Sequence, residues 1–311
     1  MVPDPLTGEH RPEEEAVERL LLELGGALLS CGDAVADIQD HLRRIAHLYG
    51  YPHANVSVLP TLVLVSVEPA GQPRIAHPPD QPDPRLDQSA AVFQIVRDLE
   101  GAPVPPLEAL ARLHQLRLQQ LVGDERIDQL EPMLARVEAF HESAKKRFAG
   151  QPLKIPLASA YDTVARGLFN NGRVDDALRY LQRSIALLPS VPAYDQQGVI
   201  ALKRGHAAEA RGLFQQALEL RRDARRMDEQ EKVFWQAKLQ RGLGDAEEQL
   251  DHAAEAQEAR RRSLEAYELL LGKRLDPEET AELELERAKL LHQIGERDRA
   301  AESFTRAIDA A

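Results

Sequence analysis

Apolar positions in the second half of the chain follow a pattern that recurs after 33 residues: residues 158–187 align with residues 191–220. In both copies, apolar residues recur at helical spacing up to a glycine, and a second helical segment follows it. A period of this length is typical of stacked helical repeats. The matched pairs are Tyr161 and Tyr194, Gly172 and Gly205, Ala177 and Ala210, Leu181 and Phe214, and Ser184 and Ala217.

Each copy predicts a pair of antiparallel helices. Gly172 and Gly205 supply the left-handed backbone conformation that lets one helix end and the next fold back. Ala177 and Ala210 are small, which allows the two helices of a pair to cross closely. Because one pair cannot bury its own apolar face, stacking of successive pairs forms the core. The sequence therefore predicts an all-α superhelical array.

The pattern resembles the tetratricopeptide repeat (TPR), and an ordinary helical bundle with chance similarity is the alternative. The resembling residues are Tyr161, Ala165, Leu168, Gly172, Ala177, Leu181, Ser184 and Pro189; then Tyr194, Gly198, Ala201, Gly205, Ala210, Phe214 and Ala217; and later Ala288, Leu291, Gly295, Ala300, Phe304 and Ala307. A degenerate copy is expected in between, where Ala237, Gly244, Ala253 and Ala256 keep the spacing and Gln249 takes the small-residue place.

The resemblance implies a groove for a protein or peptide partner, lined by the first helix of each pair. By spacing, this partner-binding groove would include Arg166, Phe169, Asn170, Val199, Leu202 and Lys203. Phe169 and Leu202 are also suited to packing between repeats. The TPR subgroup that binds chaperone tails uses a Lys/Asn clamp, whereas the corresponding positions here are Asp162, Arg166 and Gln196. That specialised function is therefore not expected.

The last predicted helix keeps Phe304 and Ile308 on its apolar side to its end. Repeat arrays usually end in a polar cap. The missing cap predicts either pairing with another chain, as in a homo-oligomer, or packing against the first domain.

The first half of the chain changes its periodicity and predicts a small α+β domain. Helical spacing over residues 13–30 and 34–49 gives way to alternation over residues 55–59 and a β-branched run over residues 62–67. A short strand at residues 74–76, a helix that Asp87 caps and that ends at Glu100, and a helix that begins at Pro105 and Pro106 follow. The expected order is a disordered N-terminus (1–12), an α+β domain (13–122), a connecting helix with a linker (123–157) and the repeats (158–311).

This first domain resembles the cytosolic domain of the threonine/serine exporter family over residues 15–118. The matching positions are Leu24-Gly25, Cys31-Gly32, Gly50, Pro60-Thr61, Arg85-Leu86-Asp87 and Gly101. In that family a bundle of transmembrane helices follows, but here polar helical sequence and then the repeats follow. The resemblance therefore implies the fold of the cytosolic domain rather than export itself.

Composition narrows the function classes. The net charge is −12, and residues 1–125 hold 19 Asp and Glu against 9 Arg, so binding to a nucleic-acid backbone is not expected. A single cysteine, Cys31, excludes an internal disulfide and a cysteine metal cluster. The sequence contains neither a transmembrane stretch nor a signal pattern, which predicts a cytosolic location.

Motifs for catalysis, metals or cofactors are missing from the sequence. His41, His47 and His53 do not share a helix face, so a metal site there is not expected. His77, Asp87 and Ser89 form the one candidate base–nucleophile set, and Cys31 near a helix end is a candidate for a lowered pKa. A packing role for Cys31 and a capping role for Asp87 are the simpler interpretations.

Three functions remain as hypotheses. A non-enzymatic adaptor or scaffold that binds a protein partner agrees best with the repeat pattern. A soluble accessory of threonine/serine export rests on the family resemblance alone. A hydrolase would use the His77 and Asp87 region.

Overall fold

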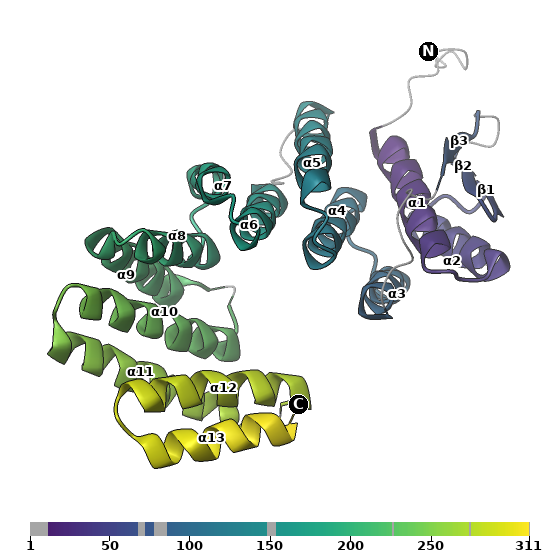
Figure 1. Ribbon diagram of the computed structural model, residues 1–311. Helices are drawn as coiled ribbons and strands as arrows, with labels where there is room; N and C mark the ends of the chain where they lie inside the picture. The colour runs from purple at the N-terminus through teal and green to yellow at the C-terminus, as the bar shows by residue number, and fades with distance from the viewer. Residues whose placement is uncertain are drawn as a thin grey trace. The chain divides into compact units, whose positions relative to one another are not determined.

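The computed structural model describes residues 12–67, 72–77, 86–147, 154–225, 227–273 and 275–310 (Figure 1). These residues form two compact units, Met1–Gly167 and Leu168–Ala311, here called unit 1 and unit 2. The expected disordered N-terminus lies outside the described residues except for Pro12, and so do Arg85 and most of the proline-rich loop.

Unit 1 contains the small α+β domain that the sequence predicts. Its helices and strands are α1 (Pro12–Ser30), α2 (Val35–Leu48), β1 (Asn55–Leu59), β2 (Leu62–Ser66), β3 (Arg74–Ala76), α3 (Leu86–Gly101), α4 (Pro106–Gly123) and α5 (Ile127–Arg147), followed by most of α6 (Lys154–Asn170). The strands form one antiparallel sheet in the order β1-β2-β3.

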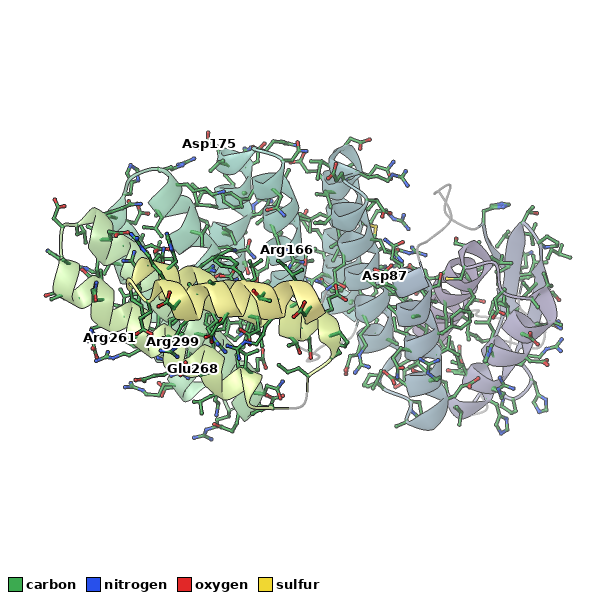
Figure 2. All side chains as sticks on the ribbon, turned by 60° about the horizontal axis from the view of Figure 1, so that its bottom comes forward. Asp87, Arg166, Asp175, Arg261, Glu268 and Arg299 are labelled. Atoms are coloured by element: carbon green, nitrogen blue, oxygen red, sulfur yellow. The ribbon has the colours of Figure 1, made fainter. Side chains whose placement is uncertain are left out.

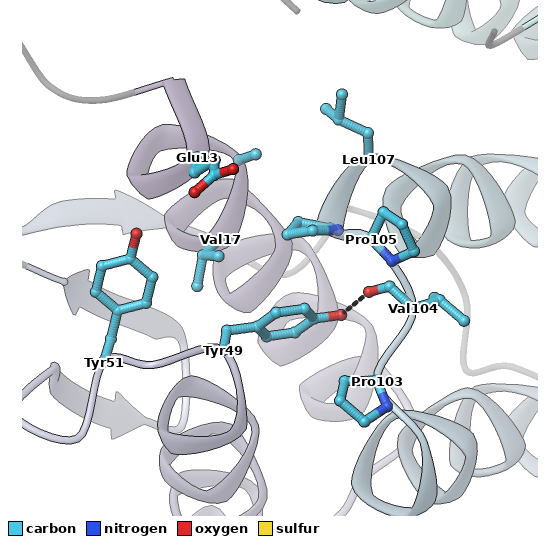
Figure 3. Close-up of a pocket in the computed structure, with 10 residues that line it drawn as sticks. Glu13, Val17, Tyr49, Tyr51, Pro103, Val104, Pro105 and Leu107 are labelled. Atoms are coloured by element: carbon cyan, nitrogen blue, oxygen red, sulfur yellow. Dashed lines mark hydrogen bonds between the residues drawn. The ribbon is translucent and has the colours of Figure 1, made fainter. Parts of the chain in front are cut away.

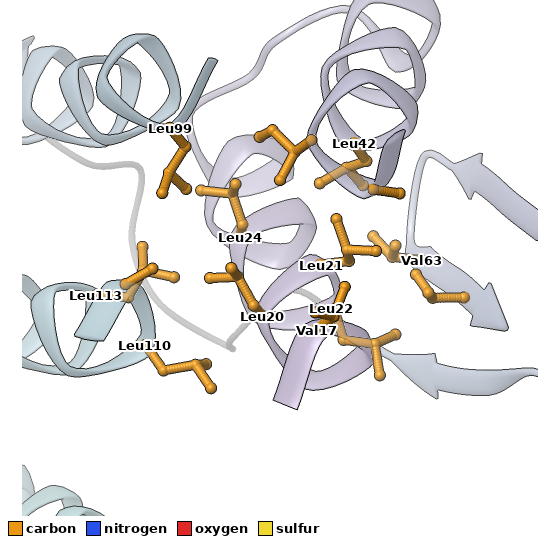
Figure 4. Packing of buried hydrophobic residues seen from close by; sticks show 14 of the residues in the cluster. Val17, Leu20, Leu21, Leu22, Leu24, Leu42, Val63, Leu99, Leu110 and Leu113 are labelled. Atoms are coloured by element: carbon orange, nitrogen blue, oxygen red, sulfur yellow. The ribbon is translucent and has the colours of Figure 1, made fainter. Parts of the chain in front are cut away.

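The core of unit 1 lies between the sheet and the helices. Val56 pairs with Val65 and Val58 with Val63, and all four side chains are buried. A Cβ atom added to Gly25 would lie 2.9 Å from Leu42 and 3.0 Å from Val63. Because glycine inside a helix costs stability, the position of Gly25 in the predicted first helix indicates the close approach of another element. The structure confirms this prediction, since Gly25 lets α1 approach both α2 and β2. Figure 4 shows this packing.

Two helix caps that the sequence predicts in unit 1, Asp33 before α2 and Asp87 before α3, are wrong. The N-cap of α2 is Ala34, and Asp33 only accepts a hydrogen bond from the Ala34 N–H at 2.9 Å. Because α3 already begins at Leu86, Asp87 lies within its first turn rather than before it. Acidic side chains there still stabilise the helix through its dipole. Pro156, expected in the linker, lies in the first turn of α6.

The helical array continues through unit 2 in consecutive helix pairs. After α6 come α7 (Val174–Leu187), α8 (Val191–Lys203), α9 (Ala207–Asp223), α10 (Glu229–Gln249), α11 (Ala253–Leu271), α12 (Pro277–Gln293) and α13 (Arg297–Ala310). Ser190, Asp228 and Asp276 each cap a helix by accepting a backbone N–H. The predicted class, a small α+β domain followed by a TPR-like array, is therefore confirmed.

The turns within the helix pairs share one backbone geometry. Gly172, Gly205 and Gly295 have φ values of 80°, 75° and 91°. In the degenerate repeat the turn lies at Asp251, with φ 61°, and Gly244 lies inside α10. The repeat spacing predicts this turn near Gly244, and that prediction is wrong. Gly244 instead allows close packing, because a Cβ there would lie 2.9 Å from the Cγ of Arg260.

The helix pair α4–α5 in unit 1 has the same turn. Glu125 has φ 55°, and the Arg126 N–H donates to the Leu121 carbonyl at 2.9 Å. The corresponding bond in α8–α9 joins His206 to Ala201, also at 2.9 Å. The predicted connecting helix buries one apolar side, on which Leu130, Leu134, Val137 and Phe140 are at most 6% exposed. We conclude that α4–α5 is built like the repeat pairs.

Phe214 holds three helices of unit 2 together. Its side chain is fully buried, and its ring atoms lie 2.6 Å from the Cβ positions that Gly198 in α8 and Gly242 in α10 lack. A bulky residue therefore packs against small residues beyond its own helix pair, because Gly242 in the next helix contacts the same ring as Gly198.

Adding a methyl group at Gly198 is expected to destabilise unit 2. The new Cβ would collide with the Phe214 ring, and overpacking of this kind costs about 1–3 kcal/mol. The matched control is Gly212→Ala in α9, where no atom lies within 4 Å of the added Cβ. The control should raise stability by up to about 1 kcal/mol, because alanine favours helix. Urea unfolding of both variants measures these changes in stability. A Gly198→Ala protein as stable as the wild type would contradict this packing.

The last helix leaves apolar side chains uncovered. Phe304 is 39% exposed and Ile308 is 76% exposed, as the sequence pattern predicts. Arg299 of α13 binds Glu268 of α11 at 2.7 Å on another side of the helix (Figure 2). Pairing of this end with another chain stays a prediction.

None of the described helices combines the length and the hydropathy that a membrane crossing needs.

Candidate functional site

A groove of about 490 Å³ lies in unit 2 along the first helices of three successive pairs, α8, α10 and α12. We call it the array groove. Its wall is apolar near Val199 and Leu202 and charged elsewhere. The lining residues are Asp195, Val199, Leu202 and Lys203 of α8; Lys238, Arg241, Gly242, Asp245, Glu248 and Gln249 of α10; and Lys289 and Gln293 of α12.

Ion pairs join neighbouring helices along the array groove. Lys238 of α10 binds Asp195 of α8 at 2.8 Å, and the Asp195 carboxylate is only 3% exposed. Arg241 of α10 pairs with Glu286 of α12, and Lys289 binds the same carboxylate at 2.8 Å. These contacts fix the spacing of the three helices and leave the lysine chains at the surface of the groove.

The acidic residues at the end of α10 are held by a buried arginine. Arg260, whose side chain is 4% exposed, donates to Glu248 at 2.6 Å and to Asp245 at 3.4 Å. The hydrogen bond from Arg260 lowers the pKa of Glu248. Burial alone would lower the pKa of Arg260, but the two carboxylates outweigh it and raise that pKa. The negative charges of Asp245 and Glu248 are therefore balanced by Arg260 of the same chain.

The structure brings together three of the six predicted groove residues: Val199, Leu202 and Lys203 line the array groove. Phe169 lies beside them, with the Lys203 Nζ 4.2 Å from the centroid of its ring. Arg166, labelled in Figure 2, and Asn170 are exposed on α6. The latter two are not among the residues that line the groove.

The lining residues from α10 and α12 were missed by the sequence reasoning. They could have been predicted from the sequence if the turn between α10 and α11 had been placed correctly. Asp195 lies ten residues before Gly205, Arg241 lies ten residues before Asp251, and both line the groove. Once the turn of this pair is placed at Asp251, counting back from it as in α8 leads to the groove positions of α10.

The candidate catalytic residues make contacts with other groups. The exposed His77 donates through Nδ1 to the Thr61 carbonyl at 3.2 Å. Ser89 forms a hydrogen bond with Cys31. Burial raises the pKa of the Cys31 thiol, more than that hydrogen bond lowers it. The lowered pKa considered for Cys31 is therefore wrong.

His41 of α2 has structural partners. His41 Nδ1 lies 2.8 Å from Glu100, and Arg44 binds the same carboxylate at 2.9 Å. Burial opposes ionisation of Glu100, but the hydrogen bonds from His41 and Arg44 lower its pKa. Across the described ranges, no group of three or more His, Cys, Asp or Glu side chains is placed to hold a metal ion.

A buried charge cluster joins α1 to α4 within unit 1. Glu23 lies 2.9 Å from His114 Nε2 and 3.6 Å from Arg117, while Arg19 binds it at 3.0 Å. The Arg19 guanidinium also lies 4.8 Å from the centre of the Phe140 ring. Burial alone would raise the pKa of Glu23, but the hydrogen bond from His114 and the nearby positive charges lower it to about 2.

Comparison with known protein families finds a match in the first domain. The family model described as "Putative threonine/serine exporter" matches residues 19–121. The first domain is thus similar to that family, as its helix stops and strand pattern predict. No sequence among the curated proteins matches the chain.

Two solved structures are similar to parts of this chain. BtubC (BKLC) from P. vanneervenii is 17% identical, with 72% of this chain and 88% of that chain covered and a TM-score of 0.46. MamA from Desulfovibrio magneticus RS-1 is 16% identical, with 64% and 94% covered and a TM-score of 0.36. The TPR-like assignment itself rests on the turns and helix packing described above.

Proposed function

We propose that the protein is a non-enzymatic adaptor whose array groove binds a segment of a partner protein. The observation that carries this proposal is the groove of about 490 Å³ along α8, α10 and α12. Its volume lies within the range of ligand-binding clefts, and it combines apolar surface with charged groups. Val199 and Leu202 would contact apolar side chains of the partner.

Lys203 gives the proposed partner its charge preference. Among the described residues it forms no ion pair, and its ammonium group lies over the Phe169 ring. The acids that line the groove, in contrast, are already bound: Lys238 binds Asp195, and Arg260 binds Asp245 and Glu248. A partner segment with apolar residues next to a carboxylate would therefore fit better than a basic segment.

The groove is tested with a photo-crosslinking amino acid at Leu202, compared with one at Gln215, an exposed residue of α9. Cells expressing the Leu202 variant should yield a crosslinked partner that the Gln215 variant does not. Lys203→Glu should then weaken binding of the purified partner by about tenfold, whereas the matched reversal Lys273→Glu should not. Equal crosslinking at the two positions, or full affinity of Lys203→Glu, would remove the proposal.

A second candidate, an accessory of amino-acid export, is favoured by the family match over residues 19–121. On this proposal the first domain contacts an exporter while the array groove binds another protein. Threonine efflux should fall in a deletion strain and recover when the full chain is restored. Unchanged efflux would exclude this role and leave the adaptor proposal standing.

A further inference from the structure

Unit 1 contains a second hollow, remote in sequence from the repeats, which we call the tyrosine cleft. Its volume is about 430 Å³. The floor comes from α1, one wall from the chain that follows α2, and the other wall from the segment that leads into α4 (Figure 3). The lining residues are Glu13, Ala16 and Val17; Tyr49 and Tyr51; and Pro103, Val104, Pro105, Pro106 and Leu107.

The cleft has a fixed shape. The Tyr49 hydroxyl donates to the Val104 carbonyl at 2.6 Å, which ties the end of α2 to the proline-rich wall. Burial raises the pKa of Tyr49 to about 12, so this donor keeps its proton throughout the physiological range. Prolines at 103, 105 and 106 restrict the backbone of that wall. A ligand would therefore meet a largely preformed surface.

The charge of the lining is one-sided. Of the ten residues that line the cleft, Glu13 alone carries a charge, and it is exposed in the first turn of α1. In Figure 3 its carboxylate and the rings of Tyr49 and Tyr51 surround Val17. Aromatic faces and a carboxylate attract positive charge, whereas a ligand carboxylate or phosphate would find no cationic partner among these ten side chains.

We propose that the tyrosine cleft binds an organic cation, namely a quaternary or protonated amine on an apolar body. The apolar body would lie against Val17, Leu107 and the prolines, and the positive charge would lie between the tyrosine rings and Glu13. A free amino acid such as threonine fits poorly, because its carboxylate would be left without a partner. The proposal is independent of the array groove.

The test uses the full chain and benzyltrimethylammonium, followed by ¹H–¹⁵N NMR titration. Signals of residues around Tyr49, Tyr51 and Leu107 should shift. The neutral isostere neopentylbenzene and the anion phenylacetate should bind at least about tenfold more weakly, because they lack the cation–π contact and the ion pair. Threonine should cause no shift in these signals.

Single substitutions test whether the cation binds in the tyrosine cleft. Glu13→Gln and Tyr51→Leu should each weaken binding of benzyltrimethylammonium several-fold, while Asp37→Asn, an exposed carboxylate in α2 outside the cleft, should not. Unchanged melting of each variant would show that the fold is retained. Equal binding of the neutral isostere, shifts confined to other residues, or displacement of the probe by a proline-rich peptide that binds more tightly would overturn the proposal.

Discussion

Replacing Phe214 by alanine is expected to destabilise unit 2 by about 3–5 kcal/mol, the range for removing a fully buried aromatic ring. The ring fills the space that Gly198 and Gly242 leave open, so its loss creates a cavity shared by α8, α9 and α10. Because two helices would have to move to close that cavity, we expect little relaxation and a cost toward the upper end of the range.

The matched control is Phe234→Ala, which removes the same atoms from a side chain that is 39% exposed. Its cost should stay near 1 kcal/mol, as expected for a partly exposed position. The single tryptophan, Trp235, packs against the core cluster that contains Phe214, so its fluorescence in urea reports the unfolding of unit 2. Equal destabilisation by both variants would contradict the role given to Phe214.

Glu23 is expected to make the stability of unit 1 depend on pH below 5. Its pKa is lowered from 4.5 to about 2 in the folded protein. The carboxylate therefore contributes stability above its unfolded pKa, and this contribution, about 3 kcal/mol, is lost as pH falls through the folded pKa. Glu23→Gln should remove this dependence and also lower the stability at pH 7, because Arg117 would remain buried without its partner.

Hydrogen exchange of amides in α1 and α4, read by mass spectrometry, measures this effect, since unit 1 lacks a tryptophan. The comparison variant is Glu142→Gln, whose side chain is 60% exposed and should change exchange little at any pH. If wild-type and Glu23→Gln proteins lost protection in parallel between pH 5 and pH 3, the assigned role of Glu23 would be wrong.

The helix pairs could be predicted from the sequence wherever the glycine at the expected position makes the turn and has no other role. Gly172 and Gly205 adopt the left-handed conformation that the spacing predicts. In the third pair the role is divided: Asp251 makes the turn, while Gly244 accommodates Arg260. Aspartate tolerates the left-handed region, and glycine also serves close packing, so the residue types alone do not distinguish the two positions.

The array groove could be predicted in part for the same reason. Val199, Leu202 and Lys203 follow from a correctly placed turn at Gly205. The ion pair between Lys238 and Asp195 could not be predicted, because it joins residues 43 positions apart through a helix whose turn was placed too early. The tyrosine cleft was missed because Pro105 and Pro106 were interpreted only as a helix start.

The links between Asp195 and Lys238 and between Arg241 and Glu286 join the groove helices through charge, whereas Phe214 joins neighbouring helices through apolar contact. Salt screens such part-buried pairs only in part, whereas the Phe214 contact carries no charge for salt to screen. The spacing of α8, α10 and α12 along the array groove should therefore loosen slightly with rising ionic strength, while the packing around Phe214 should stay the same. A partner that brings its own carboxylates would compete for the same lysine and arginine, and would widen the groove as it enters.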